Sequence, residues 1–81
     1  MRKIIKDKKY KHFKGQIYKV ICIAYDSEAN NESEFKKLVV YQALDGEKLI
    51  WVRDYDMFAS LVDIEKYPEV KQTYRFEEID W

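Results

Sequence analysis

Two apolar runs flank a short turn in the middle of the chain: Leu38-Val39-Val40-Tyr41-Gln42-Ala43-Leu44, then Asp45-Gly46-Glu47-Lys48, then Leu49-Ile50-Trp51-Val52-Arg53. Both runs are rich in β-branched and aromatic residues, which favour strands, and the turn contains the Asp-Gly pair typical of tight hairpins. The stretch therefore predicts a β-hairpin. The rest of the chain must cover this hairpin or pair with its edges.

Three segments outside the hairpin predict further strands. Gln16–Tyr25 reads as a long strand that is apolar on both sides. Such a strand either bends to serve two parts of a small barrel or is covered on its second face by a partner subunit. Leu61–Ile64 and Tyr74–Glu77 predict two short strands, and Pro68 separates them because proline cannot donate to a ladder.

The remaining elements give the fold class. Residues 54–60 predict one helical turn near Met57-Phe58, with both side chains dropping into the core. Five short strands with so little helix predict an all-β domain. We expect a strongly bent, five-stranded barrel of the SH3-like kind, because closure removes the exposed edges of a sheet. An open meander with one helix is the alternative architecture.

Charge is segregated along the chain, although the net charge is zero. Residues 1–19 carry eight Lys or Arg against one acid, whereas residues 45–81 carry ten acids against five Lys or Arg. Residues 1–11 predict a basic N-terminal arm, and residues 12–81 predict a single small β-barrel domain. Such a basic end is suited either to nucleic acid or to compensation of the acidic end.

The composition disfavours several kinds of chemistry. Cys22 is the only cysteine and His12 the only histidine, so the chain offers neither an internal disulfide nor four ligands for structural zinc. The acidic segments lack the glycine of a calcium loop, and no phosphate-binding glycine loop or nucleophile elbow is present. We therefore expect no metal and no cofactor. No stretch approaches the ~20 apolar residues of a membrane span, which predicts a cytoplasmic protein.

Aromatic and arginine side chains on the hairpin form the first candidate site. Tyr41, Gln42, Trp51 and Arg53 lie on adjacent predicted strands, and His12 and Tyr18 are expected at a nearby edge. Rings beside a planar cation are a common means of recognising extended peptides or bases. The sequence thus predicts a non-catalytic module that binds a peptide or protein. The structural alternative makes Tyr41 and Trp51 cross-strand or core residues, with Arg53 tied to an acid such as Asp54 or Glu28.

A second hypothesis is nucleic-acid binding by the basic arm. Lys9, Lys11 and Lys14 are interleaved with Tyr10 and Phe13, which supplies both positive charge for phosphates and rings for bases. The ten acids after residue 44 oppose this reading unless they lie on another face.

Two further hypotheses concern catalysis and self-association. A small hydrolase would use His12 as general base with Ser27 or Glu28 in support. The simpler reading of His12 is a turn residue that hydrogen-bonds the backbone. A homodimer would pair the apolar strand Gln16–Tyr25 with its copy.

Several short motifs occur together in one bacterial family: His12-Phe13-Lys14-Gly15, Tyr18, Val20, Ala24, Ser27-Glu28, Val39-Val40-Tyr41-Gln42-Ala43-Leu44, Trp51-Val52-Arg53, Met57-Phe58 and Arg75-Phe76. Over about residues 10–78 the chain closely resembles the domain-of-unknown-function family numbered sixteen fifty-three. The resemblance implies a small β-barrel and no established activity. The chain departs from the family pattern at Asp26, commonly His, at Ala29, often Thr, and at Asp54, often Pro. A role that needs the loop histidine is not available here.

Overall fold

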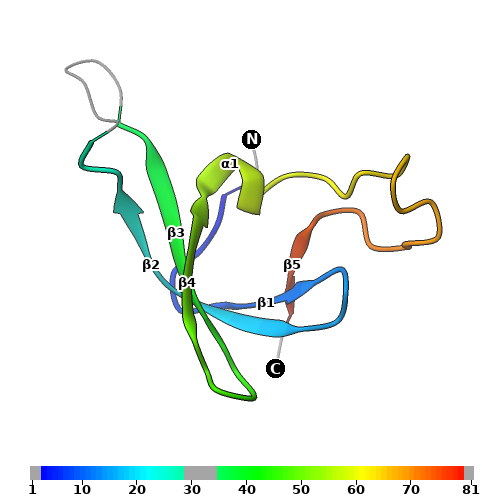
Figure 1. Cartoon of the computed structure of the whole chain (residues 1–81), viewed down its shortest axis with the longest axis horizontal. Coiled ribbons are helices and arrows are strands. Elements are labelled where there is room, and N and C mark those ends of the chain that lie inside the picture. Colours follow the sequence, from blue (N-terminus) through cyan, green and yellow to red (C-terminus); the bar gives the residue numbers. More distant parts are fainter. Residues whose placement is uncertain (1–2, 29–34, 80–81) are drawn as a thin grey trace.

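The computed structural model describes residues 3–28 and 35–79. It contains one antiparallel sheet with the strand order β4-β3-β2-β1-β5 and one short helix (Figure 1). The elements are β1 (Lys9–His12), β2 (Ile17–Tyr25), β3 (Lys37–Ala43), β4 (Ile50–Asp54), α1 (Tyr55–Phe58) and β5 (Phe76–Ile79). The all-β prediction is confirmed. The closed, SH3-like form of the barrel stays a prediction, because β4 and β5 are the two end strands of the described sheet.

The predicted hairpin is present as β3 and β4. Val40 lies opposite Val52 and Tyr41 lies opposite Trp51, and the N–H of Ala43 donates to the carbonyl of Leu49 at 3.1 Å. The turn needs left-handed backbone at Gly46, where φ is +61° and glycine has no steric cost. Residues 38–53 therefore fold as their local pattern dictates.

The long strand β2 bends, as its two-sided apolar pattern requires. Its register shifts between Val20 and Cys22, which marks a bulge. It pairs with β1 near its start and with β3 along most of its length. Pairing with β1 covers one edge of β2 only near Ile17–Lys19, so a homodimer through Gln16–Tyr25 stays a prediction.

At the ends of the sheet, the strand predicted over Leu61–Ile64 is wrong, and the last residues of the predicted basic arm belong to a strand. The basic arm over residues 1–11 includes Lys9–Lys11, which are part of β1 and lie between β2 and β5. Leu61–Ile64 is not a strand. It makes one isolated bridge, from Leu61 to Tyr74, and then Asp63 caps a turn by accepting from the N–H groups of Glu65 and Lys66.

Aromatic rings fill the core. Phe58 and Phe76 stack at 3.9 Å between ring centroids and 7° between planes, and both are almost fully buried. Phe58 belongs to α1, so the predicted helical turn is present and does deliver this ring to the core. Met57 is half exposed and does not follow it. The other buried members are Ile4, Tyr10, Val20, Val39 and Tyr41. No helix in the described ranges is long and apolar enough to cross a bilayer.

Candidate functional site

The site is built around Phe76, which β5 places against its neighbours. Phe58 covers one face of the Phe76 ring by stacking. The guanidinium carbon of Arg53 lies over the same ring, 5.5 Å from its centroid. Since Phe58 occupies one face, Arg53 lies against the other. His12 and Tyr18 meet Phe76 edge-to-face at 4.9 and 5.8 Å between centroids, so three polar side chains gather at one ring.

Arg53 is oriented by a tyrosine rather than by an acid. Its Nε donates to the hydroxyl of Tyr41 at 3.2 Å, and Tyr41 is only 4% exposed. No carboxylate among the described residues forms an ion pair with Arg53. The guanidinium therefore has a fixed plane and terminal nitrogens that bond to no described residue.

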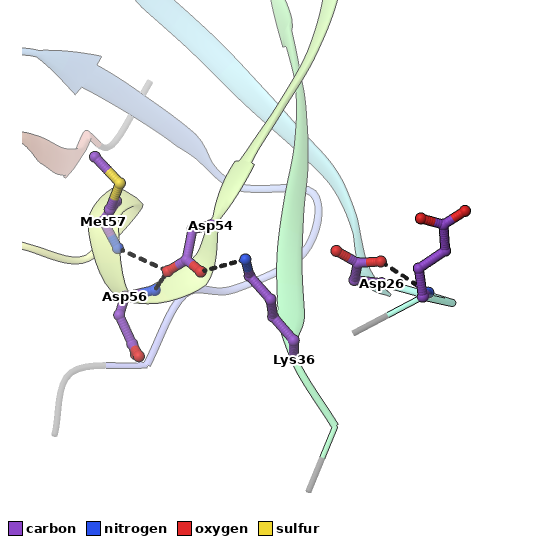
Figure 2. Close-up of polar contacts among 6 residues, drawn as sticks. Asp26, Lys36, Asp54, Asp56 and Met57 are labelled. Carbon is purple, nitrogen blue, oxygen red and sulfur yellow. Dashed lines mark hydrogen bonds and ion pairs between the residues drawn. The ribbon is translucent and has the colours of Figure 1, made fainter. Parts of the chain in front are cut away.

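The acids proposed as alternative partners of Arg53 have other roles (Figure 2). Asp54 pairs with Lys36 at 3.7 Å, and its carboxylate also accepts from the N–H groups of Asp56 and Met57. The N–H of Glu28 donates to Asp26 at the far end of β2. The tie between Arg53 and either acid is thus not formed.

His12 is held as a neutral ring. Its Nδ1 accepts from the N–H of Lys14 at 3.1 Å, which is the backbone bond expected of a turn histidine. Burial, followed by the positive charges of Arg53, Arg75 and Lys14, lowers the pKa of His12 to about 4. Such a ring is a poor general base at neutral pH, and in its neutral form it carries its proton on Nε2.

The two supports proposed for catalysis lie far from His12. Ser27 and Glu28 follow β2, whereas His12 precedes it, and the nine residues of β2 alone extend about 30 Å at the usual strand rise. Figure 1 shows the two ends of this strand on opposite sides of the molecule. The structure does not bring the three residues together.

Tyr18 places a hydroxyl beside the same cluster. Its ring meets Tyr41 edge-to-face at 5.1 Å. Burial chiefly, and then the proximity of Tyr41 and Asp45, raises the pKa of Tyr18 against the opposing effect of Arg53. Its hydroxyl makes no hydrogen bond to any described residue and stays protonated, so it is available as a donor.

Trp51 and Gln42 take different places. Trp51 lies opposite Tyr41 on the same face of the sheet, on the end strand β4, and its side chain is 49% exposed. Gln42 follows Tyr41 directly, so it lies on the other face, where its Nε2 donates to the carbonyl of Lys48. Gln42 therefore stabilises the hairpin turn and does not join the cluster.

The three lysines of the nucleic-acid hypothesis come from two parts of the fold. Lys9 and Lys11 lie on the sheet face opposite His12, and Lys11 is directly across from Glu77. Lys14 is in the following turn, where its ammonium group lies over the rings of Phe13 and Tyr67. Among the described residues, no group of three His, Cys, Asp or Glu side chains could hold a metal ion.

Sequence reasoning missed the residues that support the site. Arg75 and Phe76 are predicted only as part of a short strand and of a family motif, yet Phe76 is the ring against which Arg53 lies. The Nε of Arg75 donates to the hydroxyl of Ser60, and its charge acts on His12. Their role depends on β5 returning to β1, which no local pattern reveals.

Comparison with known proteins gives one match. No curated protein and no solved structure matches the chain significantly. The family described as "Protein of unknown function (DUF1653)" matches over residues 8–78, which is most of the chain, and the chain belongs to that family.

Proposed function

We propose that this protein is a non-catalytic binding module that recognises an extended segment of a peptide or protein. The contact surface is the aromatic–arginine patch, defined here as His12, Tyr18, Trp51 and Arg53. The observation that carries the proposal is the state of Arg53: one of its nitrogens is fixed by Tyr41, its plane lies on Phe76, and no acid among the described residues neutralises it. Uncommitted, pre-oriented guanidinium groups are favoured anchors in binding sites.

The edge of β4 supports an extended ligand. β3 occupies one side of β4, and the other side has no ladder partner among the described strands. Four consecutive apolar residues at this edge, Leu49-Ile50-Trp51-Val52, are 48–61% exposed. Folded proteins usually protect such an edge with charge or proline, because it recruits further strands. A ligand strand added here runs beside Trp51 and Arg53, which gives main-chain affinity together with side-chain specificity.

The experiment is a fluorescence titration of the 81-residue chain. Trp81 is replaced by Phe so that emission reports Trp51 alone. The ligands are five-residue peptides of alternating Thr and Val, with acetylated and amidated ends and one central guest residue. We expect quenching with at least one guest. In the same background, Trp51→Ala is followed by calorimetry and should weaken binding at least tenfold, because hot-spot aromatic residues cost ~2 kcal/mol or more when they are truncated.

Leu61→Ala is the matched control, because Leu61 is also more than half exposed but lies outside the patch. It should bind as the wild type does. Unchanged affinity of Trp51→Ala would contradict the proposal. The proposal would also be contradicted if the protein bound a ten-nucleotide single strand and Lys14→Gln, but not Trp51→Ala, abolished that binding. Such a result would favour the nucleic-acid hypothesis.

A further inference from the structure

We infer that the aromatic–arginine patch binds a carboxylate group of its ligand, through the terminal nitrogens of Arg53 with the Tyr18 hydroxyl and the His12 Nε2 as neutral donors. This inference rests on the proposed function and deepens it, because it names the chemical group that is recognised. The carboxylate belongs either to an Asp or Glu side chain or to a C-terminus, and the experiment below separates these two sources.

The geometry of Arg53 suits a planar, two-oxygen anion. The bond from Nε to Tyr41 and the contact with the Phe76 ring together fix the plane of the guanidinium. The two terminal nitrogens then present parallel N–H groups, which match the two oxygens of a carboxylate. Because the orientation is set before the ligand arrives, little side-chain entropy is lost on binding.

Two neutral donors lie around the same ring. Tyr18 and His12 both contact Phe76 edge-to-face, and both feel the charge of Arg53. The His12 ring uses Nδ1 to accept from Lys14, so its proton is on Nε2 and points to no described partner. A hydroxyl and an imidazole N–H beside one guanidinium supply donors without adding positive charge.

The surrounding charges favour a single negative charge. The positive charges of Arg53, Arg75 and Lys14 all lower the pKa of His12. The negative charge of Asp45 contributes to the raised pKa of Tyr18. The electrostatic potential near His12 is therefore positive, whereas Asp45, near Tyr18, disfavours a second negative charge on the ligand. A monoanion such as a carboxylate fits this balance better than a phosphate dianion.

The first measurement compares guest residues in the peptides described above. Central Glu should bind at least tenfold more tightly than central Gln, because hydrogen bonds to charged groups contribute ~1.5–3 kcal/mol. A third peptide has central Gln and a free C-terminus. Tighter binding of this third peptide than of its amidated form assigns the carboxylate to a chain end, and tighter binding of central Glu assigns it to a side chain. Equal binding of all three peptides overturns the inference.

The second measurement uses variants that keep the fold. Tyr18→Phe removes only a hydroxyl, and Arg53→Lys keeps the charge but loses the paired nitrogens. Each should reduce the preference for Glu over Gln severalfold while binding of the Gln peptide stays the same. Lys19→Gln is the control, because it removes a positive charge next to Tyr18 on the opposite face of the sheet and should leave the preference intact.

A third measurement separates this inference from the proposed function. Acetate and inorganic phosphate are titrated into the wild type while the His12 ring resonances are followed by NMR. If no peptide binds but acetate shifts these resonances in the wild type and not in Arg53→Lys, the carboxylate site stands and peptide recognition fails. If peptides bind through Trp51 without a preference for Glu or a free terminus, the proposed function stands and the carboxylate site fails. Tighter binding of phosphate than of acetate also overturns the inference of a carboxylate site.

Discussion

Replacing Asp54 should destabilise the protein chiefly by uncapping α1. One carboxylate oxygen of Asp54 accepts from Asp56 at 2.9 Å and from Met57 at 3.3 Å, while the other faces Lys36 at 3.7 Å (Figure 2). Loss of an N-cap acceptor costs about 0.5–2 kcal/mol. A partly exposed ion pair of this length contributes ~0–1 kcal/mol after solvent screening. Asp54→Ala should therefore lower the free energy of unfolding by about 1–2 kcal/mol.

The two contributions can be separated by the choice of substitution. Asp54→Asn keeps an oxygen that caps the helix and removes only the charge, so it should cost ~1 kcal/mol or less. Asp54→Ala loses both. In urea unfolding followed by circular dichroism, a loss of 1.5 kcal/mol lowers the midpoint by about 1 M for a chain of this size. A double-mutant cycle with Lys36→Ala isolates the ion pair, and its coupling should fall in 1 M salt.

The reasoning fails if Asn destabilises as much as Ala, because the carboxylate charge would then dominate over capping. It also fails if Asp54→Ala unfolds at the wild-type midpoint. The second result would mean that packing of Phe58 against Phe76, rather than the cap, fixes the short helix α1.

Two other perturbations test the core and His12. Phe58→Ala should cost about 3–5 kcal/mol in urea unfolding, because Phe58 is fully buried, whereas Met57→Ala, at a half-exposed neighbour, should stay within ~0.5 kcal/mol; similar losses would refute the assigned core. The pKa of His12 is about 4 in the folded protein, against an ordinary value of 6.5. Between these two pH values the unfolded chain binds a proton that the folded protein does not. The free energy of unfolding should therefore fall as the pH drops from 6.5 to 4. His12→Asn, which keeps an acceptor for the N–H of Lys14, should lose less stability than the wild type over this pH range. If the unfolding free energies of the two proteins changed in parallel with pH, the lowered pKa of His12 would be contradicted.

Local pattern was sufficient where the interactions are local. The β3–β4 hairpin follows from two apolar runs and an Asp-Gly turn, and alternation along β4 correctly places Trp51 and Arg53 on one face. The same alternation separates Gln42 from Tyr41, which a stricter use of the period of two would have shown. The bend of β2 was also implied, because a strand that is apolar on both sides needs two environments.

The pairing of strands that lie far apart in the chain could not be predicted from the sequence. Lys9 and Lys11 carry the charge of a solvated arm, yet Tyr10 between them is 1% exposed and anchors a strand in the sheet. One buried ring among lysines is too weak a signal to predict a strand. Phe76 became the centre of the candidate site only because β5 returns to β1 from the other end of the chain. No segment of about ten residues indicates either the burial of Tyr10 or the pairing of β5 with β1.

The pairing of β1 with β5 has a consequence for synthesis on the ribosome. Lys9–His12 are translated before the other described strands, whereas Phe76–Ile79, which pairs with their second edge, is translated after the other four. Until then the nascent chain carries an open ladder and a Phe58 ring without its stacking partner. Distant contacts of this kind slow folding and leave incomplete chains prone to aggregation. A product truncated before Phe76 should therefore be cleared by quality control rather than accumulate.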